Sequence, residues 1–161
     1  MGSFAGISSQ LQAAGPLHKA TARGNTAEMR RLLDAGADPN GIDRLGGKPL
    51  HYASTPETVD LLCSRGANIN GLDRKGNSTP LRIAVSSKCP NLELIKQLLR
   101  KGANKNIEDV TGTTPIIAVQ TAMEGGIVNS GLYTSTPIGD DARRTYAEVL
   151  KLFFLPQHLW Q

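Results

Sequence analysis

The chain has 161 residues, a formal net charge of +4 and an aromatic content of 4%. The length suits one domain with its own core, and the few aromatic residues argue against an aromatic-rich β-sandwich or barrel. The two cysteines, Cys63 and Cys89, are too few for a disulfide framework. No apolar run approaches the roughly 20 residues of a membrane span, and no N-terminal secretory signal is visible. We therefore expect an intracellular protein, cytoplasmic or nuclear, that does not enter a membrane.

Three short markers recur with a period close to 33 residues. A Pro-Leu or Pro-Ile pair begins at positions 16, 49, 80 and 115, a Gly-Ala pair at 36, 66 and 102, and an Asp-x-x-Gly segment at 43, 73 and 109. Proline suits the first turn of a helix, where its missing N–H would have no partner. Glycine suits the positive φ at which many helices end. The markers therefore predict a repeated pair of short helices.

Local signals indicate where these helices begin. Thr79 and Thr114 each precede a proline, and their hydroxyl groups can cap a helix. Asn25 and Glu28 are spaced as in a capping box, which would open the second helix of the first repeat. Apolar residues at helical spacing give each helix a face to bury. A helix pair of this size cannot bury that face alone, so neighbouring pairs must stack.

The markers, in this order and period, resemble the ankyrin repeat family. The fullest matches are Pro16–Ala20, Pro49–Ala53 and Thr79–Ala84, and the resemblance covers about residues 15–155. It implies an all-α solenoid of stacked helix-turn-helix units with short β-hairpin-like loops. The chain would then divide into a head or cap at 1–14, repeats at 15–40, 41–70, 71–106 and 107–155, and a C-terminal tail at 156–161.

Repeats two and three depart from the length of repeat one. The interval from Ala53 to Gly66 is shorter than that from Ala20 to Gly36, so the first helix of repeat two should be short, with Ser54 or Thr55 starting the next helix. Repeat three is longer, with a turn at 86–91 and one extra hairpin residue at 77–78. The shortened helix is similar to that of the cyclin-dependent kinase inhibitors with four ankyrin repeats, which is one alternative function.

An insertion at 123–142 interrupts repeat four. Turn signals fill it, among them Asn129-Ser130-Gly131, and helical periodicity resumes at Tyr146. Insertions in repeat arrays form loops, often on a binding face. Three interpretations stay open: a tolerated flexible loop, a lid that contacts a partner, or a segment packed against the array.

The C-terminal region is rich in large apolar residues and can be a hydrophobic cap or a docking peptide. With the inserted loop it could also enclose a pocket, which would make the protein an enzyme or a small-ligand-binding protein. The residues lining that pocket would be Tyr133, Phe153, Phe154 and Trp160.

The histidines have a structural interpretation. His18 and His51 stand at equivalent repeat positions, where the ankyrin family uses imidazole to tie neighbouring hairpins. Arg82 and Ile117 replace them in repeats three and four, so we expect the tie to be broken there. The sequence shows no catalytic constellation, no metal-ligand spacing and no phosphate-binding loop. We expect neither catalysis nor a cofactor nor a metal ion.

Ankyrin arrays usually bind proteins through hairpin tips and the ends of first helices. The residues of this chain that match such positions, together with Tyr133 of the insertion, are the predicted partner-binding set: Arg23, Arg44, Leu45, Arg74, Lys75, Lys88, Thr111, Thr113 and Tyr133.

Charge is unevenly divided along the chain. Residues 15–106 carry 15 Lys or Arg and 8 Asp or Glu, whereas residues 107–161 carry 3 and 6. Basic residues sharing one side of the stack would attract an acidic partner, although ordinary solvated surface charge is the alternative. Nucleic acid is not expected, because aromatic side chains for base stacking are missing from that face. We expect a monomeric, non-catalytic protein-interaction module, acting as an adaptor, inhibitor or effector; a fragment of a larger repeat protein is the remaining alternative.

Overall fold

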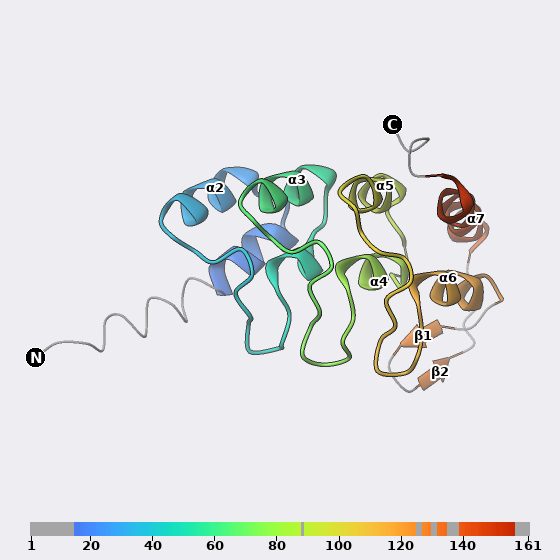
Figure 1. Cartoon of the computed structure of the whole chain (residues 1–161). Helices are drawn as coiled ribbons and strands as arrows, with labels where there is room; N and C mark the ends of the chain where they lie inside the picture. Colours follow the sequence, from blue (N-terminus) through green and yellow to red (C-terminus); the bar gives the residue numbers. More distant parts are fainter. Residues whose placement is uncertain (1–14, 88, 125–126, 130–131, 135–138, 157–161) are drawn as a thin grey trace, which may run out of the picture.

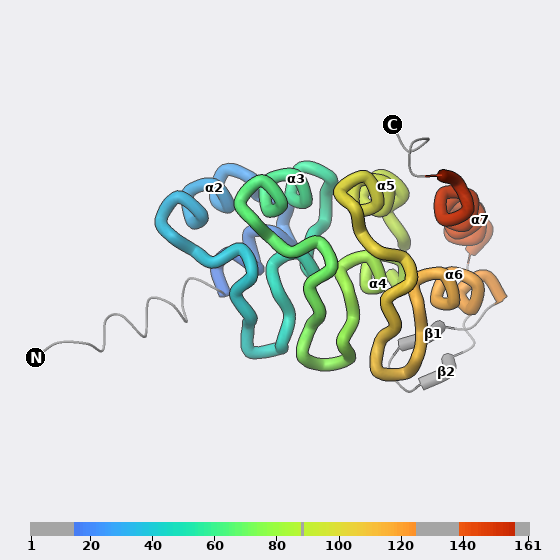
Figure 2. The backbone as a smooth tube through the Cα atoms, in the orientation of Figure 1, coloured from blue at the N-terminus to red at the C-terminus, as the bar shows by residue number. Residues whose placement is uncertain are grey.

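The computed structural model describes residues 15–87, 89–124, 127–129, 132–134 and 139–156. Its helices form two layers, and loops project from one of them (Figures 1 and 2). The layer of first helices holds residues 15–22, η1 (Pro49–Tyr52), α4 (Pro80–Val85) and α6 (Pro115–Met123). The layer of second helices holds α2 (Thr26–Asp34), α3 (Pro56–Ser64), α5 (Leu92–Arg100) and α7 (Asp140–Phe154). This is a solenoid of stacked helix-turn-helix units, which confirms the predicted fold class.

The predicted helix starts are confirmed. The Thr79 side chain accepts a hydrogen bond from the backbone N–H of Arg82, and the Thr114 side chain caps α6 in the same way. The Asn25 side chain accepts from the backbone N–H of Glu28 at 3.1 Å. The Glu28 carboxylate turns instead to Arg31, so only the Asn25 half of the expected capping box is formed.

Helix ends follow the glycine markers. Gly36, Gly66 and Gly102 all have positive φ, between 87° and 91°, as the Gly-Ala pairs predicted. Asn77, the extra hairpin residue of repeat three, has φ 50°. Asparagine tolerates this left-handed conformation better than most residues, which is why the longer hairpin can close.

The first helix of repeat two is a single 3₁₀ turn. η1 ends when the backbone N–H of Ala53 donates to the carbonyl of Leu50. Thr55 then caps α3, as the short interval to Gly66 predicted. In repeat three, α4 ends at Val85, and the Asn91 side chain caps α5.

One continuous core runs through the stack. Each pair contributes side chains that are almost fully buried, including Leu17, Leu62, Leu98 and Phe153. Burying one such side chain stabilises the fold by about 1.5–3 kcal/mol. Cys63 is half-buried and packs against this core, in line with its place on an apolar helix face.

Asparagine side chains connect the ends of successive repeats. The Asn40 amide donates to the carbonyl of Gly66 at 2.9 Å, and the Asn70 amide donates to the carbonyl of Gly102 at 3.3 Å. Each side-chain oxygen also accepts a backbone N–H from the next repeat, that of Asn68 or Asn104. These bonds hold neighbouring helix ends at a fixed offset.

Two short strands lie between α6 and α7. β1 (Ile127–Asn129) pairs antiparallel with β2 (Leu132–Thr134), with Val128 opposite Tyr133. β1 also contacts α6. We had expected a loop here; the turn signal at 129–131 and the apolar residues on both sides of it were the available indication of a hairpin.

Candidate functional site

The hairpin loops are built around the aspartate of each Asp-x-x-Gly marker. Each carboxylate accepts hydrogen bonds from two backbone N–H groups of its own turn, a common device of aspartate in turns. The pairs of donors are Leu45 and Gly47 for Asp43, Gly76 and Ser78 for Asp73, and Thr111 and Thr113 for Asp109. The carboxylates of these three aspartates therefore point into the turns.

Backbone hydrogen bonds fix neighbouring tips to one another. The N–H of Arg74 donates to the carbonyl of Gly46 at 2.9 Å, and the N–H of Val110 donates to that of Gly76 at 2.9 Å. Gly46 has φ +86°, and a Cβ there would lie 2.9 Å from Cβ of Arg74. The glycine is required both for the backbone conformation and for the close approach.

Histidines tie the first two junctions. Nε2 of His18 lies 3.0 Å from the carbonyl oxygen of Gly47, and Nε2 of His51 lies 2.9 Å from that of Ser78. The backbone N–H of Lys48 donates to Nδ1 of His51 at 3.1 Å, which leaves the proton on Nε2. Burial lowers the pKa of His51, so the neutral ring is favoured. The predicted structural role of both histidines is confirmed.

Arg82 ties the third junction, so the expectation of a break there was wrong. Nη2 of Arg82 lies 3.2 Å from Oδ2 of Asp109, and both side chains are 7% exposed. Burial lowers the pKa of Arg82 against the opposing charge of Asp109. Burial alone would raise the pKa of Asp109, but hydrogen bonds from Thr111 and Thr113 and the charge of Arg82 lower it overall. Ile117, at the same position in repeat four, is 45% exposed.

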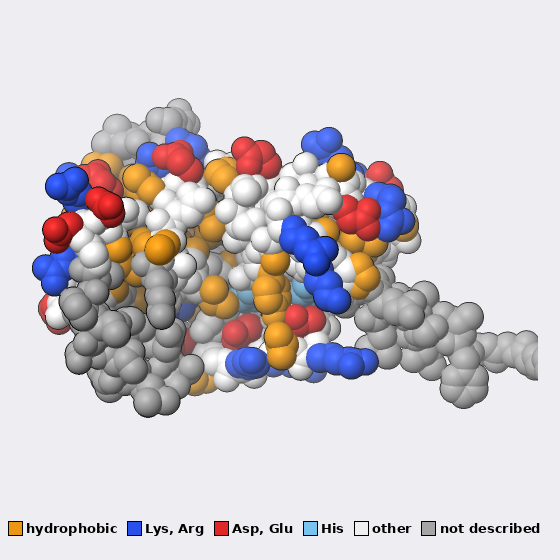
Figure 3. Space-filling model, turned by 180° about the vertical axis from the view of Figure 1, so that it is seen from behind, with side chains coloured by type: hydrophobic (Ala, Val, Ile, Leu, Met, Phe, Trp, Pro, Cys, Tyr) orange, Lys and Arg blue, Asp and Glu red, His pale blue; other side chains and the backbone are white. Residues whose placement is uncertain are grey.

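Most predicted partner-binding residues are exposed. Arg23 lies at the end of the first helix, and the others occupy hairpin tips: Arg44, Leu45, Arg74, Lys75 and Thr111. Figure 3 shows Lys and Arg side chains along the edge where these hairpins lie. Thr113 is buried instead, and its hydroxyl lies 2.9 Å from that of Thr111; it supports the tip from within. Lys88 and the side chain of Tyr133 lie outside the described residues.

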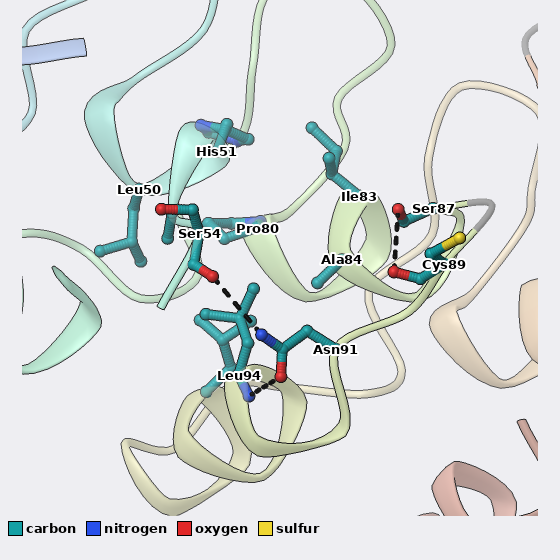
Figure 4. Close-up of a pocket in the computed structure, with 12 residues that line it drawn as sticks. Leu50, His51, Ser54, Pro80, Ile83, Ala84, Ser87, Cys89, Asn91 and Leu94 are labelled. Atoms are coloured by element: carbon teal, nitrogen blue, oxygen red, sulfur yellow. Dashed lines mark hydrogen bonds between the residues drawn. The ribbon is translucent and has the colours of Figure 1, made fainter. Parts of the chain in front are cut away.

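A surface pocket of about 240 Å³ lies between η1 and α4 (Figure 4). Its lining is Leu50, His51, Ala53, Ser54, Pro80, Ile83, Ala84, Ser87, Cys89, Asn91, Leu94 and Leu98. We did not predict this pocket, although the short first helix of repeat two was the signal for it. A helix of one turn leaves Ile83 of the neighbouring helix α4 partly uncovered.

The pocket expected under the inserted loop is not supported by the two phenylalanines. Phe153 is 1% exposed and belongs to the core, whereas Phe154 is 73% exposed. Their side chains therefore do not line a common cavity. Trp160 lies outside the described residues. Within the part of the chain that the structure describes, no three His, Cys, Asp or Glu residues form a possible metal site, and no helix is long and apolar enough to span a membrane.

Stacked helix pairs with hydrogen-bonded hairpins define a repeat scaffold of the kind that presents loop tips to other proteins. Family models agree: the model described as ankyrin repeats (3 copies) matches residues 5–73, and the model of a single ankyrin repeat matches residues 76–110. The chain belongs to the ankyrin repeat family. It is a protein-interaction module.

Relatives of this chain include a kinase inhibitor and a protein with multiple ankyrin repeats. It is 32% identical to human cyclin-dependent kinase 4 inhibitor B over 126 residues, which is 77% of this chain and 88% of that protein. The mouse protein of the same name is also 32% identical, with 93% of its length covered. Human SH3 and multiple ankyrin repeat domains protein 1 is 34% identical over 64% of this chain but only 5% of its own length.

Proposed function

We propose that the protein binds a protein partner, without catalysis, across its tip face. The tip face comprises the exposed side chains of the three hairpin tips and the adjoining first helices: Arg23, Arg44, Leu45, Arg74, Lys75, Val110 and Thr111. The observation that carries the proposal is the row of backbone hydrogen bonds from Arg74 to Gly46 and from Val110 to Gly76. A surface fixed in this way loses little conformational entropy on binding.

The charge of the tip face indicates an acidic partner. Arg44, Arg74 and Lys75 are exposed, while the aspartates of the same loops are engaged by their own backbones. Complementary charge speeds the encounter and selects the partner. We propose that the protein meets this partner as a monomer in the cytoplasm or nucleus, where the free thiols of Cys63 and Cys89 remain reduced.

Charge reversal tests the tip face. The variant Arg44→Glu/Lys75→Glu is compared with Arg30→Glu/Arg143→Glu, which changes two exposed arginines in the layer of second helices, on α2 and α7. Both variants should keep the melting temperature of the wild type. A partner captured from lysate by the wild type, then purified, should bind the first variant about tenfold more weakly and the control normally. Equal affinity for both variants would reject the tip face.

Inhibition of a cyclin-dependent kinase is a second candidate. Two observations favour it: the similarity to cyclin-dependent kinase 4 inhibitor B over 77% of the chain, and the single turn of η1 in repeat two. The test is a titration of purified cyclin-dependent kinase 4 with the protein, followed by calorimetry and by kinase activity. Saturable binding with loss of activity would support inhibition, and the absence of binding would exclude this kinase as the partner.

A further inference from the structure

We propose that the pocket between η1 and α4 receives an aliphatic side chain from an acidic peptide segment of the partner. The inference rests on the proposed tip face and adds the chemistry of what binds there. Three features of the pocket carry it: the exposed aliphatic surface of Ile83, the size of the pocket and the charge of the two hairpins that lead into its walls.

The floor and part of the walls of the pocket are apolar, whereas its rim is polar. Leu50 of η1 and Ala53, which follows η1, line one side of the pocket, Ile83 and Ala84 of α4 line the other, and Leu94 and Leu98 of α5 supply the floor. Ile83 is 36% exposed, whereas Leu81 and Val85 of the same helix are fully buried. Its side chain therefore presents aliphatic surface to water. A partner side chain placed here would remove this aliphatic surface from water, and each buried methylene would stabilise the complex by about 0.8 kcal/mol.

The polar groups of the rim are already engaged within the protein. The Asn91 amide donates to the carbonyl of Ser54 at 3.5 Å, and its oxygen accepts from the backbone N–H of Leu94 at 3.1 Å (Figure 4). The Ser87 hydroxyl donates to the carbonyl of Cys89, and Nε2 of His51 is hydrogen-bonded to the carbonyl of Ser78. These bonds use the Ser87 hydroxyl proton, one N–H of the Asn91 amide and its oxygen, and so reduce what the rim offers to a polar ligand group. The pocket therefore favours an apolar side chain.

The size of the pocket indicates a single side chain. Its volume of about 240 Å³ lies below the roughly 300–1,000 Å³ that is typical of small-molecule sites. Interfaces between proteins commonly use a pocket of this kind for one anchoring side chain, surrounded by weaker contacts. This favours a peptide segment over a metabolite.

The hairpins beside the pocket determine the charge of that segment. Hairpin 43–47 leads into η1, and hairpin 73–78 leads into α4, so both walls begin at a basic tip. Arg44, Arg74 and Lys75 are exposed on these tips, whereas the carboxylates within the two ranges are those of Asp43 and Asp73, which accept bonds inside their turns. A segment anchored in the pocket passes these cations, and acidic residues flanking the anchor would pair with them.

A peptide library tests the proposal directly. Random peptides displayed on phage are selected on the wild-type chain of 161 residues, and an enriched peptide is synthesised with a fluorescent label for anisotropy titrations. We expect enriched peptides to share one aliphatic residue flanked by Asp or Glu. Changing that aliphatic residue to Ser should weaken binding about tenfold or more. Failure to enrich any peptide, or enrichment of basic peptides, would overturn the proposal.

Two protein variants locate the bound peptide. Ala84→Phe fills the pocket, and Ile83→Ser removes its aliphatic wall. If Ala84→Phe does not fold, Ile83→Ser still tests the proposal. Ile117→Ser is the matched control, because Ile117 is an exposed isoleucine on α6 that does not line the pocket. Both pocket variants should weaken the peptide about tenfold, and the control should bind as the wild type does.

The outcomes separate this proposal from the tip face itself. If Arg44→Glu/Lys75→Glu loses the peptide but the pocket variants bind it normally, the tip face stands and the pocket inference is wrong. If the pocket variants lose the peptide but charge reversal has no effect, the proposed charge of the segment is wrong. If none of these variants loses the peptide, both proposals fail.

Discussion

Two neighbouring junctions of this stack are connected by side chains of different chemistry at the same repeat position. At the junction of repeats two and three, the neutral ring of His51 holds the carbonyl of Ser78. At the junction of repeats three and four, the Arg82 guanidinium holds the Asp109 carboxylate. In both cases a buried side chain at the same repeat position reaches the hairpin of the next repeat. What the position requires is a donor long enough to cross the junction.

The difference lies in what each junction loses when its donor is removed. A neutral hydrogen bond contributes about 0.5–1.5 kcal/mol net, because water competes for both groups in the unfolded chain. A buried ion pair gains little over an apolar pair, yet it is costly to break on one side, since a charge is left unpaired. The third junction should therefore be the more sensitive to a single substitution.

The largest effect is expected for Arg82→Ala. It leaves the buried Asp109 carboxylate without its cation and should lower the free energy of unfolding by about 3–5 kcal/mol, measured by urea denaturation. The double variant Arg82→Met/Asp109→Asn keeps the volume and the acceptor of the turn and should recover much of this loss. A loss for Arg82→Ala no larger than that for His51→Ala would contradict the contrast between the junctions.

A smaller effect is expected for His51→Ala. The carbonyl of Ser78 and the N–H of Lys48 both lose their partner, and leaving such a group unsatisfied costs about 1–3 kcal/mol when it is buried. The same urea titration measures the loss. Arg30→Ala, at an exposed arginine of α2, is the control and should change the midpoint little. An equally small change for His51→Ala would show that water replaces the imidazole.

The smallest effect is expected on acidification. Because burial lowers the pKa of His51 below its ordinary 6.5, the stability from its neutral ring is present above pH 6.5 and is lost as the pH falls through the lowered value. The pKa of Asp109 is lowered below 3.8, so its contribution is lost only in more acidic solution. Between these two values the His51 junction should weaken while the Arg82 junction persists.

The comparison of wild type with His51→Gln measures this effect. The urea midpoint of the wild type should fall between pH 6.5 and pH 3.8, and that of His51→Gln should fall less, since it lacks the titrating ring. Carboxylates elsewhere titrate equally in both proteins and cancel in the difference. Identical pH profiles would mean that His51 does not weaken its junction when it is protonated.

Features set by nearby residues were predictable from the sequence. The caps at Thr79 and Thr114 and the positive φ of Gly36 depend on a few adjacent positions, and all three were confirmed. The ion pair between Arg82 and Asp109 was not predicted. The repeated histidine shows that imidazole can connect two hairpins, but it does not show which other side chains can make the same connection. Only the geometry shows that an arginine reaches the same hairpin.

The candidate site was predictable in part. Exposure of Arg44 and Lys75 follows from their place in a tight turn, but the burial of Thr113, whose backbone N–H donates to the Asp109 carboxylate inside the turn, was missed. The pocket beside Ile83 was also missed, because it depends on how two helices of unequal length lie against each other. Repeat markers give the register of such helices and not the space between them.

The asparagine bonds between repeats have a consequence for how such a protein can change. Asn40 reaches Gly66 across 26 positions of sequence, and Asn70 reaches Gly102 across 32, yet the bonds are the same. Differences in repeat length are thus absorbed by the hairpin, the first helix and the turn that follows it, while the second helices α3 and α5 keep the same length of nine residues. Insertions and deletions can then reshape the side of the hairpins and first helices, where we propose that the partner binds, without disturbing the side of the second helices. In this scaffold, changes of repeat length during evolution would alter the surface that could recognise a new partner and leave the rest of the stack in place.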